Sequence, residues 1–248
     1  MRRLQAARAL LAGAGGLGSN VAVLLARLGV AELTIYDPGV VDAPDLNRQV
    51  LYLPADLGRP KVDVAEQRLS EINPSVRLNV RRERIVGSTR LPDADICFDC
   101  LDSFGARASL EAALQSGPGL TQRTASIPAS RDSDAPRGLP LPLIHGGAEG
   151  WFGQVSTLEP GGRGYRGVFG PAFEQRADEE AEGKPIMPHV VSLVAAAQVA
   201  EFVRWCEGGT PAMLVDRILA IDGMTHEHEI IKLQPFNTQN GADHADKA

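Results

Sequence analysis

The chain has 248 residues, which fits one large domain or a domain with an added lobe. Its 44% hydrophobic and 23% charged residues are ordinary for a globular protein that buries a core without disulfides. The net charge of -6 argues against non-specific binding to nucleic acid or to an anionic membrane surface. Three cysteines without framework spacing, no membrane-spanning apolar run and no visible signal peptide predict a cytoplasmic protein.

The N-terminal half alternates predicted strands and helices. Residues 7–12 form a short apolar run that ends in glycine, as in a buried parallel strand, and residues 17–28 have helical spacing. The alternation continues with strands at 32–37, 76–85 and 95–98 and with helices at 61–72 and 103–115. This order predicts an α/β fold with a Rossmann-like, largely parallel sheet and helices on both faces.

The C-terminal half is expected to extend the sheet with antiparallel strands. The predicted elements are strands at 139–145, 151–158, 215–221 and 227–233 and a largely buried helix at 189–206. Residues 118–137 collect Pro, Ser, Arg, Asp and Gly, which predicts a loop insertion. Residues 171–188 are interpreted as a charged loop, and 236–248 as a flexible polar tail.

A glycine-rich turn joins the first predicted strand to the first helix, with the sequence Gly13-Ala14-Gly15-Gly16-Leu17-Gly18. Gly13 permits the tight turn, Gly15 lets backbone N–H groups approach a phosphate, and Gly18 lets the helix pack close to the sheet. Asp37 ends the second strand, where a carboxylate can accept hydrogen bonds from ribose hydroxyls. The two features together predict a nucleotide site, and NAD and ATP both remain candidates.

Cations follow in the next loop and at the start of the next helix. The segments are Asp45-Leu46-Asn47-Arg48-Gln49 and Gly58-Arg59-Pro60-Lys61. Arg48 can make forked bonds to phosphate oxygens, and Lys61 can supply a point charge. A dehydrogenase has no need of cations here, whereas a triphosphate does, so the spacing favours ATP.

These motifs resemble the MoeB/ThiF/HesA family, relatives of the ubiquitin-activating enzymes. The resemblance runs from about residue 7 to residue 233 and includes Tyr36-Asp37, Asp99-Cys100-Leu101-Asp102 and Gly150-Trp151-Phe152-Gly153-Gln154-Val155. It implies a single ThiF-type nucleotide-binding adenylation domain over 1–235. It also implies that ATP contacts Gly13, Gly15, Gly16, Gly18, Asp37, Asp45, Asn47, Arg48, Lys61, Asp102 and Ser103.

The family's chemistry, if carried over, is adenylation. A carboxylate attacks the α-phosphate of ATP and pyrophosphate leaves, with Arg48, Lys61 and Asp102 as the catalytic residues. Asp102 would help place Mg²⁺, a hard cation suited to carboxylate and phosphate oxygens. The implied substrate is the C-terminal Gly-Gly of a small ubiquitin-fold sulfur-carrier protein, and the implied assembly is a homodimer, with no nucleic acid or membrane partner.

The sequence also departs from the family pattern. Many members carry two Cys-x-x-Cys pairs for a structural zinc, but the first pair's position reads Gly164-Tyr165-Arg166-Gly167 and the second pair has no counterpart, so no structural zinc is expected. The 171–188 loop has no cysteine for covalent transfer, and the printed sequence reaches the first predicted strand within a few residues, so the family's N-terminal arginine arm is not expected. Asp45 and Ser103 stand where the family often has Asn, and Asp45 adds a negative charge near the phosphates.

Two alternative functions follow from these departures. One is a nucleotide-binding relative with weakened or lost catalysis. The other is adenylation of a small molecule or of a modified tRNA base, against which the acidic net charge counts for RNA. His145 ends a predicted strand and could border the site, although a hydrogen-bonded structural histidine is the favoured interpretation.

Overall fold

The computed structural model describes residues 2–116, 139–162, 164–170, 173 and 186–233. Eight strands form one sheet in the order β3-β2-β1-β4-β5-β6-β7-β8. The strands are β1 (Arg8–Ala12), β2 (Glu32–Tyr36), β3 (Arg77–Arg81), β4 (Ile96–Asp99), β5 (Leu143–Glu149), β6 (Phe152–Leu158), β7 (Arg217–Asp222) and β8 (His228–Lys232). In this order, neighbouring strands from β3 across to β5 are parallel, and neighbouring strands from β5 across to β8 are antiparallel. This arrangement confirms the predicted fold class.

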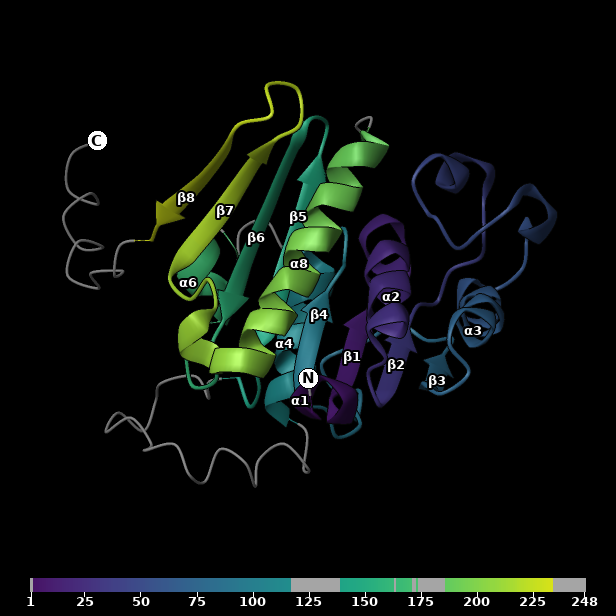
Figure 1. The fold of residues 1–248 in the computed structure, drawn as a ribbon, viewed down its shortest axis with the longest axis horizontal. Helices are drawn as coiled ribbons and strands as arrows, with labels where there is room; N and C mark the ends of the chain where they lie inside the picture. The colour runs from purple at the N-terminus through teal and green to yellow at the C-terminus, as the bar shows by residue number, and fades with distance from the viewer. Residues whose placement is uncertain (1, 117–138, 163, 171–172, 174–185, 234–248) are drawn as a thin grey trace, which may run out of the picture.

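Helices cover both faces of the sheet, as the sequence predicts (Figure 1). On one face lie α2 (Gly16–Leu28), α3 (Lys61–Ile72) and α8 (Pro188–Gly208), whose apolar side chains share one core cluster. On the other face lie α4 (Phe104–Ser116) and α6 (Gly164–Phe169), which belong to a second cluster. The described residues also contain three short 3-10 helices, namely η1 (Ala43–Asn47), η2 (Pro54–Asp56) and η3 (Thr210–Ala212).

Several element boundaries differ from the predictions for identifiable reasons. β3 ends at Arg81 rather than at residue 85, because its partner β2 has only five residues and the register ends at the Tyr36–Arg81 pair. β5 begins at Leu143 rather than at residue 139, because the preceding apolar residues are buried without pairing as a strand. α6 was not expected from the sequence.

A short N-terminal helix, α1 (Arg2–Ala6), precedes the first strand, although the sequence analysis predicted none. Leu4 is buried, and the Arg3 guanidinium carbon lies 3.9 Å from the centre of the Trp205 ring near the end of α8. α1 therefore lies at the end of β1 opposite to the glycine-rich turn (Figure 1). The segments 118–137 and 236–248 and most of the 171–188 loop lie outside the described residues.

The topology creates a crevice at one edge of the sheet. The chain leaves β1 through α2 towards β2 on one side, whereas β4 pairs with β1 on the other side. In open α/β sheets, ligands bind outside the carboxyl ends of the strands where the strand order reverses. The turn after β1 and the loop after β4 therefore meet at the place where a ligand is expected.

Within the described residues, no helix is long and apolar enough to cross a membrane.

Gly18 allows α2 to begin against the turn that precedes it. A Cβ atom at this position would collide with the Gly13 carbonyl oxygen and lie 3.5 Å from the Cβ of Cys100. We predict that Gly18→Ala lowers the free energy of unfolding by about 1–3 kcal/mol, because the start of the helix must move. Urea denaturation measures this change. Gly15→Ala is the matched control, since outside its chain neighbours a Cβ there would meet the Gln49 amide nitrogen at 3.8 Å and nothing closer. Equal losses of stability in both variants would contradict the prediction.

Candidate nucleotide site

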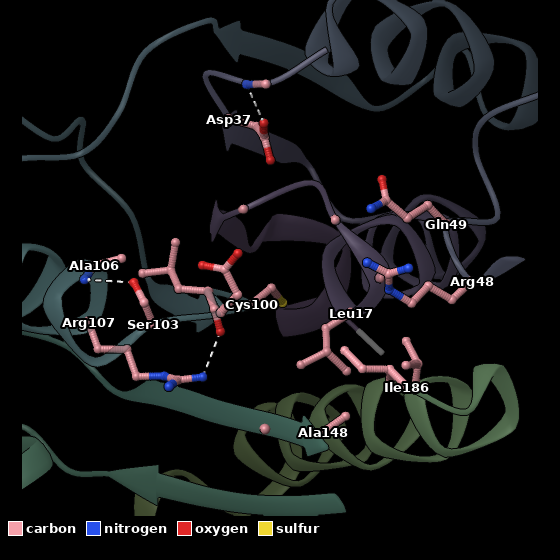
Figure 2. Close-up of a pocket in the computed structure, with 18 of the residues that line it drawn as sticks. Leu17, Asp37, Arg48, Gln49, Cys100, Ser103, Ala106, Arg107, Ala148 and Ile186 are labelled. Carbon is pink, nitrogen blue, oxygen red and sulfur yellow. Dashed lines mark hydrogen bonds between the residues drawn. The ribbon is translucent and has the colours of Figure 1, made fainter. Parts of the chain in front are cut away.

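A pocket of about 1240 Å³ opens at the carboxyl ends of the parallel strands (Figure 2). Nine of the predicted site residues line it, namely Gly13, Gly15, Gly16, Asp37, Asp45, Arg48, Lys61, Asp102 and Ser103. Gly18 and Asn47 do not line the pocket. Gly18 acts in the packing of α2, and the Asn47 side-chain oxygen accepts a hydrogen bond of 2.9 Å from Arg48.

The glycine-rich turn is tied to the second strand by Asp37. Gly13 has a φ of 95°, and a Cβ at this position would lie 2.7 Å from the Cys100 carbonyl oxygen. The two carboxylate oxygens of Asp37 accept bonds of 2.7 Å each from the backbone N–H groups of Ala14 and Gly39. A carboxylate has about four acceptor positions, so the remaining ones can still accept ribose hydroxyls.

Asp45 connects most of the polar groups on one wall of the pocket. Its carboxylate lies 3.0 Å from the Lys61 ammonium, accepts a 2.6 Å bond from the Gln49 amide and lies 3.8 Å from the Arg48 guanidinium. It also accepts the backbone N–H of Asp42 and so closes the capping box of η1. The negative charge at this position is therefore compensated within the protein, mainly by Lys61.

Arg48 lies along the glycine-rich turn. A Cβ at Gly16 would be 3.4 Å from the Arg48 Cγ, so the stem of the side chain packs on the start of α2. One guanidinium nitrogen donates to the Pro44 carbonyl oxygen at 2.8 Å and to Asn47. The guanidinium has five N–H donors, so several remain for phosphate oxygens.

The loop that carries Asp102 is held from below by buried groups. Asp102 is exposed, and it follows Leu101, whose backbone N–H donates to Asp99 at 2.9 Å and whose carbonyl oxygen accepts from Arg107 at 2.6 Å. Figure 2 shows the Arg107 guanidinium beneath the loop with this second bond dashed. Arg107 also donates to the fully buried Asp99 carboxylate at 3.1 Å.

His145 lies in the middle of β5, is buried, and donates or accepts at both ring nitrogens. Its Nδ1 is 2.6 Å from Asp99, and its Nε2 is 3.2 Å from the Gln154 amide nitrogen. Burial lowers the pKa of His145 more than the bond to Asp99 raises it. Burial raises the pKa of Asp99, but Arg107, His145 and the Leu101 N–H outweigh it, so that pKa lies below its usual value. The pair is therefore a neutral imidazole that donates from Nδ1 to a carboxylate.

The sequence analysis missed several residues that line the pocket. Gln49 and Arg107 belong to elements that it had predicted, and their neighbours Arg48 and Ser103 were among its candidates. Further missed residues come from β5, β6, α6, α8 and the segment just before α8, namely Gly147, Ala148, Glu149, Phe152, Gly153, Gln154, Phe169, Ile186 and Val191. The family motif at 150–155 is the one signal in the sequence that pointed to this second wall.

The cysteines occupy the core. Cys97 and Cys100 belong to separate clusters on the two faces of the sheet, and burial raises both pKa values well above the ordinary value. Burial also raises the pKa of Cys206, which is half-buried in α8. In the described part of the chain, no group of three or more His, Cys, Asp or Glu residues is placed to hold a metal ion.

An open α/β sheet with a glycine-rich turn, a carboxylate after the second strand and cations beside the turn defines a nucleotide-binding protein. The comparison with known families is more specific. The model of the ThiF family matches residues 1–242, and the chain belongs to this family, as the resemblance implied.

Curated relatives match over most of their length. The chain is 28% identical over 217 residues to the sulfur carrier protein ThiS adenylyltransferase of Escherichia coli (strain K12), which covers 85% of this chain and 77% of that protein. It is 30% identical over 242 residues to the molybdopterin-synthase adenylyltransferase of Haemophilus influenzae, which covers 96% of this chain and 89% of that protein.

The fold is also that of solved structures of E. coli MccB. The crystal structure of MccB with AMPCPP and MccA superposes with a TM-score of 0.72 at 18% sequence identity. The match covers 94% of this chain and 65% of that chain, so this chain spans somewhat less than two thirds of MccB. At this identity the likeness establishes the fold.

The neutral state of His145 makes stability depend on pH. In the unfolded chain a histidine titrates near its ordinary pKa of about 6.5. In the folded chain His145, beside Asp99, Arg107 and Tyr165, protonates at a lower pH. Because the unfolded state binds more protons between these two values, the free energy of unfolding falls as pH drops below about 6.5, by at most ~1.4 kcal/mol per pH unit.

We therefore predict that the stability difference between the wild type and His145→Asn narrows from pH 7.5 to pH 5.5. The Asn variant lacks the titrating group, whereas the other four histidines are present in both proteins. Urea denaturation at the two pH values measures the difference. A constant difference would show that His145 has an ordinary pKa in the folded protein.

Proposed function

We propose that the chain is an ATP-dependent adenylyltransferase that activates the C-terminal glycine carboxylate of a ubiquitin-like sulfur-carrier protein as an acyl-adenylate. The observation that carries this proposal is that the glycine-rich turn, Asp37, Arg48, Lys61 and Asp102 all line one pocket. The curated relatives support it, since those named above are adenylyltransferases of a sulfur carrier and of molybdopterin synthase. The retention of the phosphate-binding cations argues against a relative that has lost catalysis.

The roles of the residues follow from their positions. Backbone N–H groups at the start of α2 point toward a bound phosphate and carry the positive end of the helix dipole. Asp37 binds the ribose with its free acceptor positions. Arg48 and Lys61, which share Asp45 as a neighbour, turn to the phosphate oxygens and stabilise the charge that develops there.

The donor set also fits Mg²⁺, which is usually bound by one or two carboxylates together with substrate phosphates. Asp102 is an exposed carboxylate that lines the pocket and would hold the ion. When bound, the ion would neutralise charge on the phosphate oxygens. Asp45 is engaged by Lys61 and Gln49, so it is the less suitable ligand.

The proposed reaction requires positioning more than a strong base. The carboxylate oxygen forms a bond to the α-phosphorus, the bond from this phosphorus to the bridging oxygen breaks, and pyrophosphate leaves with that oxygen. The second wall of the pocket, formed by β5, β6 and α8, supplies the space for an extended glycine tail. A homodimer is part of this proposal.

The proposal predicts carrier-dependent exchange of pyrophosphate into ATP. With a carrier protein that ends in Gly-Gly, the wild type is expected to catalyse exchange, and a carrier shortened by its last glycine is not. Asp102→Asn, Lys61→Ala and Arg48→Ala are each expected to lose on the order of 100-fold or more. Lys61 and Arg48 stabilise the developing charge directly, and Asp102 would hold the Mg²⁺ that neutralises charge on the phosphate oxygens.

Asp63→Asn and Arg27→Ala are the matched controls, since they remove a carboxylate and a cation from α3 and α2 outside the pocket lining. They are expected to retain the wild-type rate. ATP binding without exchange with any Gly-Gly carrier would overturn the activity, and NAD binding in place of ATP would overturn the nucleotide assignment.

The ion pair between Asp45 and Lys61 predicts that a neutral residue at 45 strengthens ATP binding. Asp45→Asn keeps an acceptor for Gln49 but removes the charge that competes with phosphate for Lys61. We expect the Kd for ATP without Mg²⁺ to fall about tenfold, since charges this close interact by several kcal/mol even when partly screened.

Isothermal titration calorimetry in the presence of a chelator measures this Kd. Asp42→Asn is the control, because Asp42 is an exposed carboxylate on the same 3-10 turn and does not line the pocket. Weaker binding by Asp45→Asn would mean that the carboxylate serves to orient Lys61 rather than to compete for it.

A further inference from the structure

A continuous set of hydrogen bonds runs beneath the pocket from its second wall to the loop of Asp102. It consists of Gln154 on β6, His145 on β5, Asp99 at the end of β4 and Arg107 on α4. The successive contacts measure 3.2 Å, 2.6 Å and 3.1 Å. The two ends, Gln154 and Arg107, line the pocket, whereas Asp99 and His145 are buried.

The hydrogen-bond directions in this set follow from the charge on Asp99 and from a neutral His145 imidazole. Asp99 is an ionised carboxylate and can only accept, so the Nδ1 of His145 carries the proton. The Nε2 of a neutral imidazole then has a free lone pair, which accepts from the Gln154 amide. The packing of the ring is also fixed, because Tyr165 and Phe169 meet it edge-on at centroid distances of 5.9 Å and 5.2 Å.

The set ends on the backbone of one residue. Asp99 accepts the N–H of Leu101, and Arg107 donates to its carbonyl oxygen. Both peptide groups that flank Leu101 are therefore fixed relative to the buried carboxylate. Asp102 follows directly, and it is the residue assigned to the metal in the proposed function. None of the four side chains needs to touch the substrate to affect where Asp102 lies.

We propose that Gln154, His145, Asp99 and Arg107 form a positioning relay that holds the Asp102 loop in register with the second wall of the pocket. The proposal rests on the proposed function for its catalytic consequence. Its structural claim does not, because it states that a change at β6 or β5 alters the loop after β4. These four are positioning residues, since they act through Leu101 and Asp102.

The test uses the full-length protein and three variants of the relay. His145→Leu removes the donor to Asp99, His145→Asn keeps a short donor there, and Gln154→Leu removes the bond at the far end. Thr157→Val is the control, because Thr157 on β6 is as buried as His145 but donates to Glu201 on α8 at 2.9 Å. Hydrogen exchange of the peptide that covers residues 99–104 reports the loop directly and needs no activity.

We expect His145→Leu to speed exchange at the Leu101 amide about fivefold to tenfold, the amount that one lost hydrogen bond accounts for. Gln154→Leu is expected to give a smaller increase, His145→Asn is expected to restore most of the protection, and Thr157→Val to leave the peptide unchanged. In pyrophosphate exchange, the relay variants are expected to lower kcat and raise the Mg²⁺ concentration for half-maximal rate, with the KM for ATP within about twofold, because the turn and Asp37 are untouched.

Unchanged hydrogen exchange at the Leu101 amide in both His145→Leu and Gln154→Leu would overturn the relay, whatever the enzymatic activity of these variants. An equal loss of hydrogen-exchange protection at Leu101 in the Thr157→Val control would also overturn the relay, because it would indicate general loosening of the sheet. If His145→Leu does not fold, Gln154→Leu at the pocket wall decides the outcome. Absence of pyrophosphate exchange by the wild type would refute the proposed function instead. The hydrogen-exchange result would still test the relay.

Discussion

The site depends on the close approach of α2 to the carboxyl ends of two strands. α2 begins in contact with the backbone of Gly13, and Gly13 itself lies against the carbonyl of Cys100 at the end of β4. Neither Gly13 nor Gly18 has room for a Cβ atom, so the glycine-rich turn and the loop after β4 are brought to the same point. Asp37 then fixes the turn to β2 through the N–H of Ala14. The phosphate-binding turn, the ribose carboxylate and the Asp102 loop take their places from this contact.

Two ion pairs form at the pocket before any ligand binds. Lys61 faces Asp45, and Arg107 faces Asp99. The two pairs differ in accessibility. Asp45 and Lys61 line the pocket and can exchange partners with phosphate, whereas Asp99 is fully buried. Separating a buried pair leaves an uncompensated charge, which costs several kcal/mol. The first pair is suited to ligand exchange and the second to holding a loop.

Much of the fold could be predicted because its signals are local. The glycines of the turn, the helical spacing after them and the carboxylate at Asp37 each follow from a short stretch of sequence. The boundaries that failed depend on partners distant in sequence. β3 stops where β2 stops, and the apolar residues before β5 are buried without pairing, and neither fact is visible in the segment itself.

The candidate site shows the same division. Nine of the predicted residues come from short sequence motifs, and the structure brings them to one pocket. The contribution of Gln154 and of the β5 residues requires the register of β5 against β4 and β6, which pairs His145 with both Asp99 and Ser156. Asp45 could be named from its position, but its ion pair with Lys61 depends on a contact between η1 and α3.

The bonds to Leu101 have a consequence for how this loop can vary over evolution. Both hydrogen bonds use the backbone peptide groups of Leu101, so they do not depend on its side chain. Only packing constrains which residue can stand at this position. Asp99 and Arg107 have no such freedom. Loss of either residue leaves a buried charge without its partner, so intermediate sequences that change only one of them are disfavoured. Substitutions at these two positions should therefore arise together, eight residues apart, in lineages that replace the pair.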